Sequence, residues 1–232
     1  MDKKMNVMEA IETRHSVRGF LDKPVDEETI RKVVAAANCA PSWACTRPWQ
    51  YYVATGEAVE RIRKEYVALN TAKAPVDYDI PCNPVWPERE NTNTLTWGAN
   101  RLKVQWDVDP NDPKDEAKLN EVKEHLQVMM SNLFYAPTLV VSCMDKGLHN
   151  WALYDMGASA MELQLAAHNY GLGVITAYHL VRYPKVLREV LGIPDNLEVV
   201  CGMAMGYKDE DSVENKYIAL RTPVEEMCTI VK

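Results

Sequence analysis

The chain lacks the features that mark several large classes of protein. None of its apolar runs is long enough to span a bilayer, and residues 1–5 lack the apolar core of a signal peptide. No two of its six cysteines form a CxxC pair, so neither a zinc site nor a redox dithiol is indicated. The five histidines are scattered and indicate no metal site. We therefore expect a cytoplasmic protein that has no membrane partner and binds no metal.

Basic residues are also in the minority. The chain has 26 lysines and arginines against 33 acidic residues, a formal net charge of -7. This balance argues against general nucleic-acid binding but leaves room for a local basic pocket. No Gly-x-Gly-x-x-Gly follows a predicted strand, so a Rossmann dinucleotide site is not indicated. A length of 232 residues with 47% hydrophobic residues suits one sizeable soluble domain over residues 1–232.

Hydrophobic periodicity predicts a mixture of helices and a few apolar strands. Asp26 is a plausible N-cap, because two acidic residues follow it in the first turn of a predicted helix. Helices are expected at residues 6–13, 26–40, 57–69, 119–134, 149–170 and 185–191. Strands are expected at residues 50–54, 138–144, 174–177 and 197–206. The pattern indicates an α+β layered fold but does not determine the order of the strands.

Residues 72–116 have no clear periodicity and contain six prolines and three of the six tryptophans. A disordered linker rarely holds so many tryptophans, so we interpret this segment as an ordered, irregular excursion. It could form a lid over a pocket or cover a partner subunit. A purely structural arm fits the same composition.

The first chemical motif is Arg14-His15-Ser16-Val17-Arg18. Alternate side chains of an extended segment share one face, so Arg14, Ser16 and Arg18 would point the same way. Two guanidiniums and a hydroxyl make an anion-binding surface, because arginine offers planar, bidentate donors to phosphate. A solvated basic turn explains this motif alone about equally well.

A second motif makes the first more specific. Residues 40–49 read Ala-Pro-Ser-Trp-Ala-Cys-Thr-Arg-Pro-Trp. Arg-x-Ser-x-Arg after a short helix, followed by Ala-Pro-Ser and Pro-Trp, resembles the FMN-dependent nitroreductase family. Later features keep the same order: Tyr-Ala-Pro-Thr at 135–138, a long helix that ends in Gly-Leu-Gly at 171–173, and Arg-Thr-Pro-Val-Glu-Glu at 221–226. The resemblance covers nearly the whole chain except residues 72–116.

The resemblance implies a three-layer fold with a central, mostly antiparallel sheet flanked by helices, and an intertwined homodimer with FMN at the subunit interface. It implies hydride transfer from NADH or NADPH to small electron-poor acceptors, such as nitroaromatics and quinones, by a ping-pong mechanism. The flavin would carry the chemistry, so no side chain is assigned as catalytic. Two alternatives stay open: a reductive dehalogenase or other non-nitro reductase of the same fold, and a non-enzymatic flavin-binding protein.

The resemblance also assigns roles to the first motif. Arg14 and Arg221 match residues that bind the FMN phosphate, and Ser16 matches a contact to the phosphate or ribityl chain. Arg18 matches the cation beside N1 and the C2 carbonyl of the flavin. His15 lies alongside, either as a contact or as a residue that positions the backbone.

Three residues of the second motif, Pro41, Ser42 and Trp43, match the loop beside the flavin ring. Cys45 and Arg47 depart from the family, which often has Asn and Gln there. We expect Cys45 to pack or to make a weak polar contact rather than to act as a nucleophile. Arg47 either contacts an anionic group of the substrate or faces the flavin or an acid of the excursion.

Two further positions complete the expected site. Residues Thr176, Ala177, Tyr178 and His179 match the backbone that lies over the flavin and donates an N–H toward N5, although a strand end that turns into a loop is the simpler interpretation. Ala219 stands where the family often has a second basic phosphate ligand. Lys216 could replace that ligand from further away.

Overall fold

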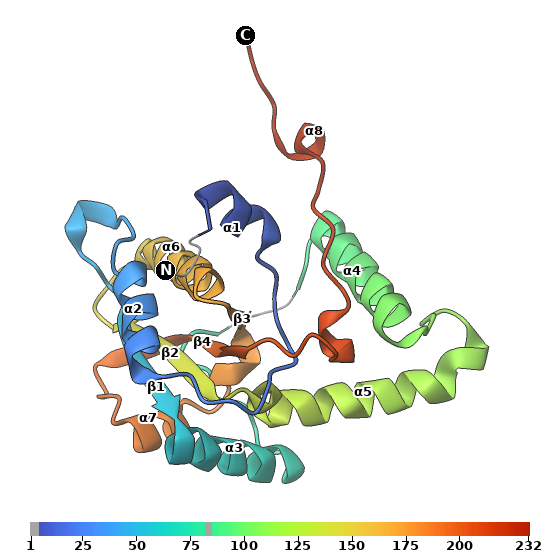
Figure 1. The fold of residues 1–232 in the computed structure, drawn as a ribbon, viewed down its shortest axis with the longest axis horizontal. Coiled ribbons are helices and arrows are strands. Elements are labelled where there is room, and N and C mark those ends of the chain that lie inside the picture. The colour runs from blue at the N-terminus through green and yellow to red at the C-terminus, as the bar shows by residue number, and fades with distance from the viewer. Residues whose placement is uncertain (1–4, 82–84) are drawn as a thin grey trace.

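An antiparallel sheet forms the centre of the computed structural model, which describes residues 5–81 and 85–232 (Figure 1). Its strands are β1 (Gln50–Thr55), β2 (Thr138–Asp145), β3 (Leu172–Ala177) and β4 (Leu197–Tyr207). They lie in the order β1-β2-β4-β3, and every neighbouring pair is antiparallel. β1 and β3 are therefore the edge strands, and β3 carries part of the expected site.

Helices cover both faces of this sheet. Leu139 and Val141 of β2 pack in one buried cluster with α3 (Gly56–Thr71) and α7 (Pro184–Leu191). Val140, between them, belongs to a second cluster with α2 (Glu27–Ala37) and α6 (Ala152–Asn169). Successive strand side chains point to opposite faces, so an uninterrupted apolar run in β2 serves both layers. The expected α+β, three-layer architecture is confirmed.

Local signals explain where several helices begin and end. The Asp26 carboxylate accepts a hydrogen bond from the Thr29 N–H at 2.8 Å and caps α2, as predicted. Asn6 caps α1 (Val7–Thr13) in the same way. Gly171 follows α6 with φ of 73°, a conformation that glycine adopts without strain. The predicted elements all exist, although α2 ends at Ala37 rather than near residue 40.

The expectation of an irregular segment at 72–116 needs correction, because residues Glu88–Trp106 form the 19-residue helix α4. The helix escapes periodicity analysis because it has no continuous apolar stripe. Gln105 is its only buried residue, while Leu95 and Val104 are exposed. Helix α5 (Glu116–Ser131) follows after a short 3₁₀ turn. Cys82 and Pro84, also part of the expected excursion, lie outside the described residues.

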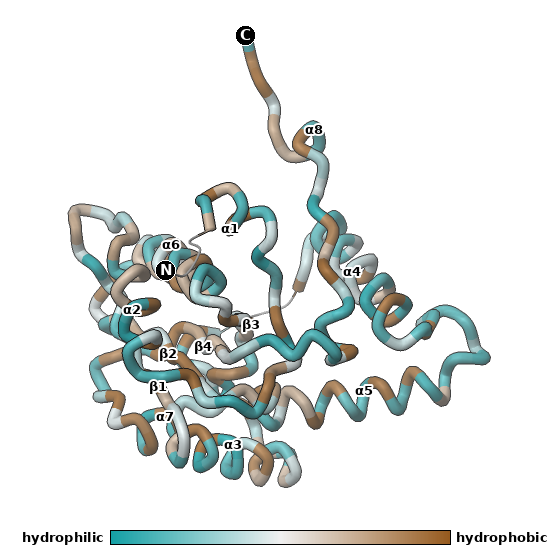
Figure 2. Tube along the Cα trace, viewed as in Figure 1, coloured by the Kyte–Doolittle hydropathy of each residue, from teal (hydrophilic) through white to brown (hydrophobic). Residues whose placement is uncertain are grey.

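Several segments project from the sheet and its covering helices. Figure 1 shows α4 and α5 extending to one side, and the C-terminal arm, residues 218–232 with α8 (Val224–Met227), extending away from the body. Figure 2 shows hydrophobic stretches along this arm. Leu220, Ile230 and Val231 are 81%, 79% and 88% exposed. In the part of the chain that the structure describes, no helix is long and apolar enough to cross a membrane.

Candidate flavin site

The Arg14–Arg18 segment runs along the outer edge of β3. Ser16 forms a parallel bridge with Val174, and the Val17 N–H donates to the Val174 carbonyl at 3.1 Å. The segment lies so close that a Cβ on Gly173 would stand 2.6 Å from the Val17 side chain. Val17 is buried, as alternation in an extended segment requires when its neighbours face a cavity. The sheet edge therefore sets the register of the first motif.

A cavity of about 120 Å³ brings the first motif together with the C-terminal arm. No acidic side chain is among its lining residues, which are Arg14, His15, Ser16, Arg18, Trp97, Tyr217, Ala219 and Arg221. Burial, and then the charge of Arg221, lower the pKa of Arg14. Two neighbouring guanidiniums that lack a carboxylate between them suit a doubly charged phosphate, which arginine binds bidentately. These residues fit the phosphate end of FMN.

Arg18 is the most deeply buried cation of the cavity. Its backbone N–H donates to Asn215 Oδ1 at 2.8 Å, and its guanidinium carbon lies 5.8 Å from the ring centroid of Trp97. Burial and the nearby Arg101 lower its pKa to about 10, while Glu214 opposes this shift. Arg18 therefore remains charged at neutral pH. The role beside N1 and the C2 carbonyl that the family resemblance implies for Arg18 stays a prediction.

The 176–179 segment lies at the C-terminal end of β3, where the charge of Arg18 acts on His179. Thr176 and Ala177 end β3, and Tyr178 and His179 begin a short 3₁₀ helix. Burial, Arg182 and Arg18 lower the pKa of His179 to about 4, so the ring is neutral at pH 7.

Tyr178 is anchored away from this cavity. Its hydroxyl donates to the Ile80 carbonyl, and its ring stacks on Tyr78 at a centroid distance of 3.9 Å. These contacts hold the Tyr178 side chain in place, and the predicted flavin contact concerns the backbone of the segment.

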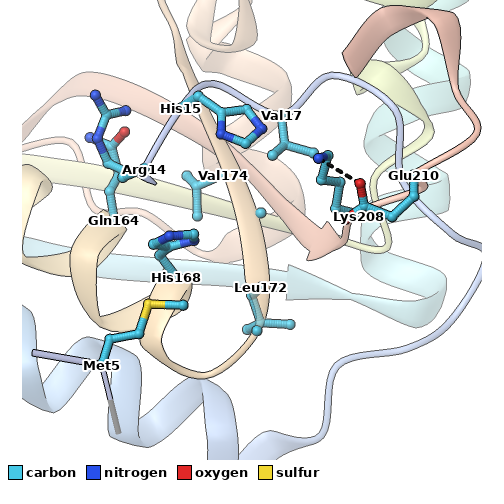
Figure 3. Close-up of a pocket in the computed structure, with 12 residues that line it drawn as sticks. Met5, Arg14, His15, Val17, Gln164, His168, Leu172, Val174, Lys208 and Glu210 are labelled. Atoms are coloured by element: carbon cyan, nitrogen blue, oxygen red, sulfur yellow. Dashed lines mark ion pairs between the residues drawn. The ribbon is translucent and has the colours of Figure 1, made fainter. Parts of the chain in front are cut away.

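A second cavity, of about 200 Å³, shares Arg14 and His15 with the first (Figure 3). His15, His168 and Lys208 also line it, and Lys208 pairs with Glu210 at 2.7 Å. Sequence analysis missed Lys208. The available signal was its place directly after β4, where a bridge to Phe20 holds it near the first motif.

Neither cavity is lined by Lys216, the expected substitute for a basic residue at Ala219. Lys208 is therefore the additional lysine that the fold places near Arg14. The imidazole Nε2 of His15 is buried without a hydrogen-bond partner in the described structure, so a polar ligand group could still pair with it.

The second motif lies elsewhere, beside the first turn of α6. The Trp43 N–H donates to Asp155 Oδ2 at 3.1 Å, and the Arg47 N–H donates to Ser42 Oγ at 2.9 Å. A carboxylate in the first turn of a helix is favourable, so Asp155 is a stable anchor for the loop. The Trp43 ring packs edge-on against His149 and is 59% exposed.

Strained backbone shapes this loop. Ala44, Cys45 and Arg47 have φ of 50°, 56° and 45°, which non-glycine residues seldom adopt. Such conformations persist only where the surrounding structure enforces them, and they are frequent at functional sites. Pro41, Cys45 and Arg47 are exposed. The loop is thus held in one shape while its side chains face outward.

The two motifs stand at opposite ends of α6. Asp155, in its first turn, holds the loop, while His168, in its last turn, contacts Thr13 at 2.8 Å next to Arg14. At 1.5 Å per residue these helix positions are about 20 Å apart. One chain therefore gathers Arg14, Ser16, Arg18 and Arg221 around one cavity, whereas loop 41–47 is held at the other end of α6.

The buried cysteines show no sign of chemistry. Burial raises the pKa of Cys143 to about 12 and that of Cys201 to about 11, so both thiols stay protonated and pack as small apolar groups. Cys45 is exposed. Across residues 5–81 and 85–232, no three histidine, cysteine or acidic side chains gather as a metal site.

Comparisons with known proteins give the family of the chain. A sequence model of the nitroreductase family matches residues 11–207. The chain is 31% identical to nitrobenzene nitroreductase of Ectopseudomonas oleovorans, over 95% of each chain. It is 27% identical to 4-nitrobenzoate reductase of Pseudomonas putida, over 93% of this chain and 89% of the relative.

A solved structure shares the fold. The FMN-dependent nitroreductase NfnB from Mycobacterium smegmatis, crystallised with NADPH, superposes with a TM-score of 0.85 over 96% of each chain at 23% identity. The family match spans both motifs, β3 and most of the sheet. On these grounds the chain belongs to the nitroreductase family.

Proposed function

We propose that this protein is an FMN-dependent oxidoreductase that takes hydride from NADPH or NADH and passes it to nitroaromatic compounds or other electron-poor acceptors, such as quinones. The observation that carries the proposal is the pair Arg14 and Arg221 across an acid-free cavity, with Arg18 buried beside it. A nitroarene as acceptor is supported by the names of the nitrobenzene and 4-nitrobenzoate reductases. A cytoplasmic location is part of the proposal.

The side chains would bind and tune the cofactor. When bound, the flavin supplies the hydride chemistry, and negative charge develops at N1 and the C2 carbonyl on reduction. Arg14, Arg221 and Ser16 would hold the phosphate and ribityl chain. Arg18 would stabilise the negative charge of the reduced ring, since a preorganised cation acts strongly in a partly dry site. The backbone of residues 176–179 would donate toward N5.

The second half of the site would come from another copy of the chain. Loop 41–47 is anchored at Asp155, about 20 Å along α6 from His168 at 1.5 Å per helical residue, and His168 contacts Thr13 next to Arg14. We assign the loop at each flavin to the partner of the chain that holds the phosphate, as the expected homodimer implies. The C-terminal arm offers the contact, because Leu220, Ile230 and Val231 have no apolar cover in one chain.

A groove of about 750 Å³ beside edge strand β1 could receive such an arm. Its apolar lining comes from α2 and β1, including Ile30, Val34 and Val53. An unpaired strand edge next to an apolar groove favours the addition of an extended segment. We assign the arm of a second copy to this groove.

Anaerobic reduction tests the proposed activity. The purified protein should release FMN, identified by chromatography, and NADPH or NADH should bleach its yellow colour. Added nitrobenzene should restore the oxidised spectrum. Recovery of FAD, or failure of both donors to bleach the flavin, would contradict the proposal. Bleaching without reoxidation by any nitroarene or quinone would favour a different acceptor, and product analysis with a halogenated phenol would then test reductive dehalogenation.

Subunit mixing tests the shared site. One variant carries Arg14→Ala and Arg221→Ala, and the other carries Trp43→Glu in the loop. Each homodimer should lose most FMN binding. A mixed dimer contains one site built from the intact half of each chain, so refolding the two variants together should restore about one of the two sites. No recovery in a demonstrated mixed dimer contradicts a shared site.

A further inference from the structure

A second cation stands behind Arg18, and it comes from helix α4. The guanidinium carbon of Arg101 lies 5.7 Å from the ring centroid of Trp97, and that of Arg18 lies 5.8 Å from the same centroid. The indole thus contacts both cations, each with a favourable cation–π interaction. The charge of Arg101 is felt at Arg18, whose pKa it lowers after the larger effect of burial. The two like charges need a counter-charge nearby.

Glu214 supplies that counter-charge. It is 3% exposed, and its Oε2 accepts from Arg101 at 3.0 Å. Its Oε1 lies 2.7 Å from His125 Nε2 on α5, and its backbone carbonyl accepts from Gln105 at 2.7 Å. The carboxylate raises the pKa of both Arg18 and Arg101 against the effect of burial. A buried charge with several partners is held in one geometry.

Glu214 belongs to a short 3₁₀ turn, Val213–Asn215, that also holds the backbone of Arg18. Asn215, the neighbour of Glu214, accepts from the N–H groups of Arg18 and Gly19 at 2.8 and 3.2 Å. Its side-chain amide donates to the Gly19 carbonyl at 2.8 Å. Glu214 and Asn215 therefore connect α4 and α5 to the segment that carries Arg18. Because this connection fixes the position of Arg18, a change of charge at Glu214 alters the electric field at Arg18.

We propose that Arg101 and Glu214, with Trp97 in contact with both guanidiniums, are positioning residues that set the net charge acting on the pyrimidine edge of the bound flavin through Arg18. The inference rests on the proposed FMN function. Arg101 adds positive charge behind Arg18, so it favours the reduced, more negative flavin. Glu214 withdraws part of that effect. Helix α4 thereby tunes how readily the cofactor gives up its electrons, in addition to any role as a cover.

The test is the midpoint potential of bound FMN, measured by dye equilibration, together with the affinity for oxidised FMN. Glu214→Gln removes the charge and keeps the polar shape, so the ratio of reduced to oxidised affinity should rise about tenfold, or about 30 mV for a two-electron couple. Arg101→Met should lower the ratio by a similar factor. Arg101→Lys keeps the charge and should stay close to wild type.

A matched control is Asp79→Asn, which removes the acid of another largely buried ion pair, with Arg188. It should lower stability without moving the potential. If Glu214 and Arg101 were merely structural, their variants would also lose stability without a change in the midpoint potential. Unchanged potentials in FMN-loaded Arg101→Met and Glu214→Gln overturn the inference, as do shifts in the same direction.

Partial failure of the variants still gives an answer. If Glu214→Gln does not fold, Arg101→Met against Arg101→Lys decides the inference, because only the first removes the charge. A wild-type protein that binds no FMN overturns this inference together with the proposed function. A wild type that binds FMN and is bleached by NADPH, with variants of unchanged potential, overturns this inference alone.

Discussion

The central sheet and the projecting segments use apolar residues in opposite ways. In the sheet layers, Leu163 of α6, Leu139 of β2 and Met203 of β4 are completely buried by other parts of the same chain. In the C-terminal arm, Leu220, Ile230 and Val231 are mostly exposed, although they are equally hydrophobic. Large exposed apolar surface of this kind marks a protein-binding site. The comparison teaches that one chain completes its core but leaves its arm without cover.

The largest effect is expected from removing the arm. Deletion of residues 224–232 keeps Arg221 but removes Val224, Met227, Ile230 and Val231, each worth about 1.5–3 kcal/mol if a second copy buries it. The free energy of dimer association should weaken by several kcal/mol. Sedimentation at micromolar concentration would then detect a monomer. Val76→Ser, at an exposed apolar residue outside the arm, should leave the dimer intact. A truncated protein that dimerises as tightly as the wild type would contradict the role given to the arm.

A matched pair of leucines sharpens the same comparison. Leu163→Ala empties a fully buried position between α6 and the sheet and should cost about 2–5 kcal/mol of the free energy of unfolding. Leu220→Ala, at an 81% exposed position, should change the unfolding of the monomer by less than about 0.5 kcal/mol. Urea denaturation of both variants in the truncated background isolates the monomer. Equal losses would mean that the arm packs on its own chain.

A third prediction concerns pH and His179, in the short 3₁₀ helix that follows β3. Burial depresses the pKa of His179 from 6.5 to about 4, so the unfolded chain binds more protons between these values. The free energy of unfolding should therefore rise with pH from about 4 to 6.5, by up to about 3 kcal/mol from this group. His179→Leu should flatten that rise in urea titrations of FMN-free protein. An unchanged slope would mean that His179 is not the titrating group.

The smallest effect is expected at the exposed loop. The Arg47 guanidinium makes no ion pair among the described residues, so it is free to attract a carboxylate on the acceptor. Arg47→Gln should lower the ratio of kcat/KM for 4-nitrobenzoate over nitrobenzene about fivefold, the range of an exposed ion pair. Arg61→Gln on α3 is a control that removes an exposed arginine elsewhere. An unmoved ratio would shift attention to α4.

The sequence predicted the sheet layers well, because burial on both faces leaves clear marks. The apolar run at residues 139–141 predicts strand β2, and the N-cap Asp26 predicts the start of helix α2. Helix α4 left no such mark, since its partner is polar: the side chains of Arg101 and Gln105 both donate to Glu214. Those contacts join residues more than 100 positions apart, which local pattern cannot reveal. The network behind Arg18 was therefore invisible before the fold was known.

The candidate site divides in the same manner. Arg14, Ser16 and Arg18 were predicted to share a face, and pairing with β3 gives them that arrangement. Lys208 was missed because only the fold brings it near the first motif, through the bridge between Lys208 and Phe20 after β4. The resemblance placed both motifs at one flavin, whereas one chain holds them at opposite ends of α6. A linear motif carries no information on which copy of the chain supplies it.

The cavity between Arg14 and Arg221 also constrains when the cofactor can be captured during biosynthesis. Arg14 leaves the ribosome long before Arg221 does. The sheet that positions Arg14 is itself incomplete until β4 has emerged. A nascent chain therefore has no way to hold a phosphate group between the two guanidiniums until Arg221 has been added. A product of translation that stops before Arg221 would lack half of this phosphate site.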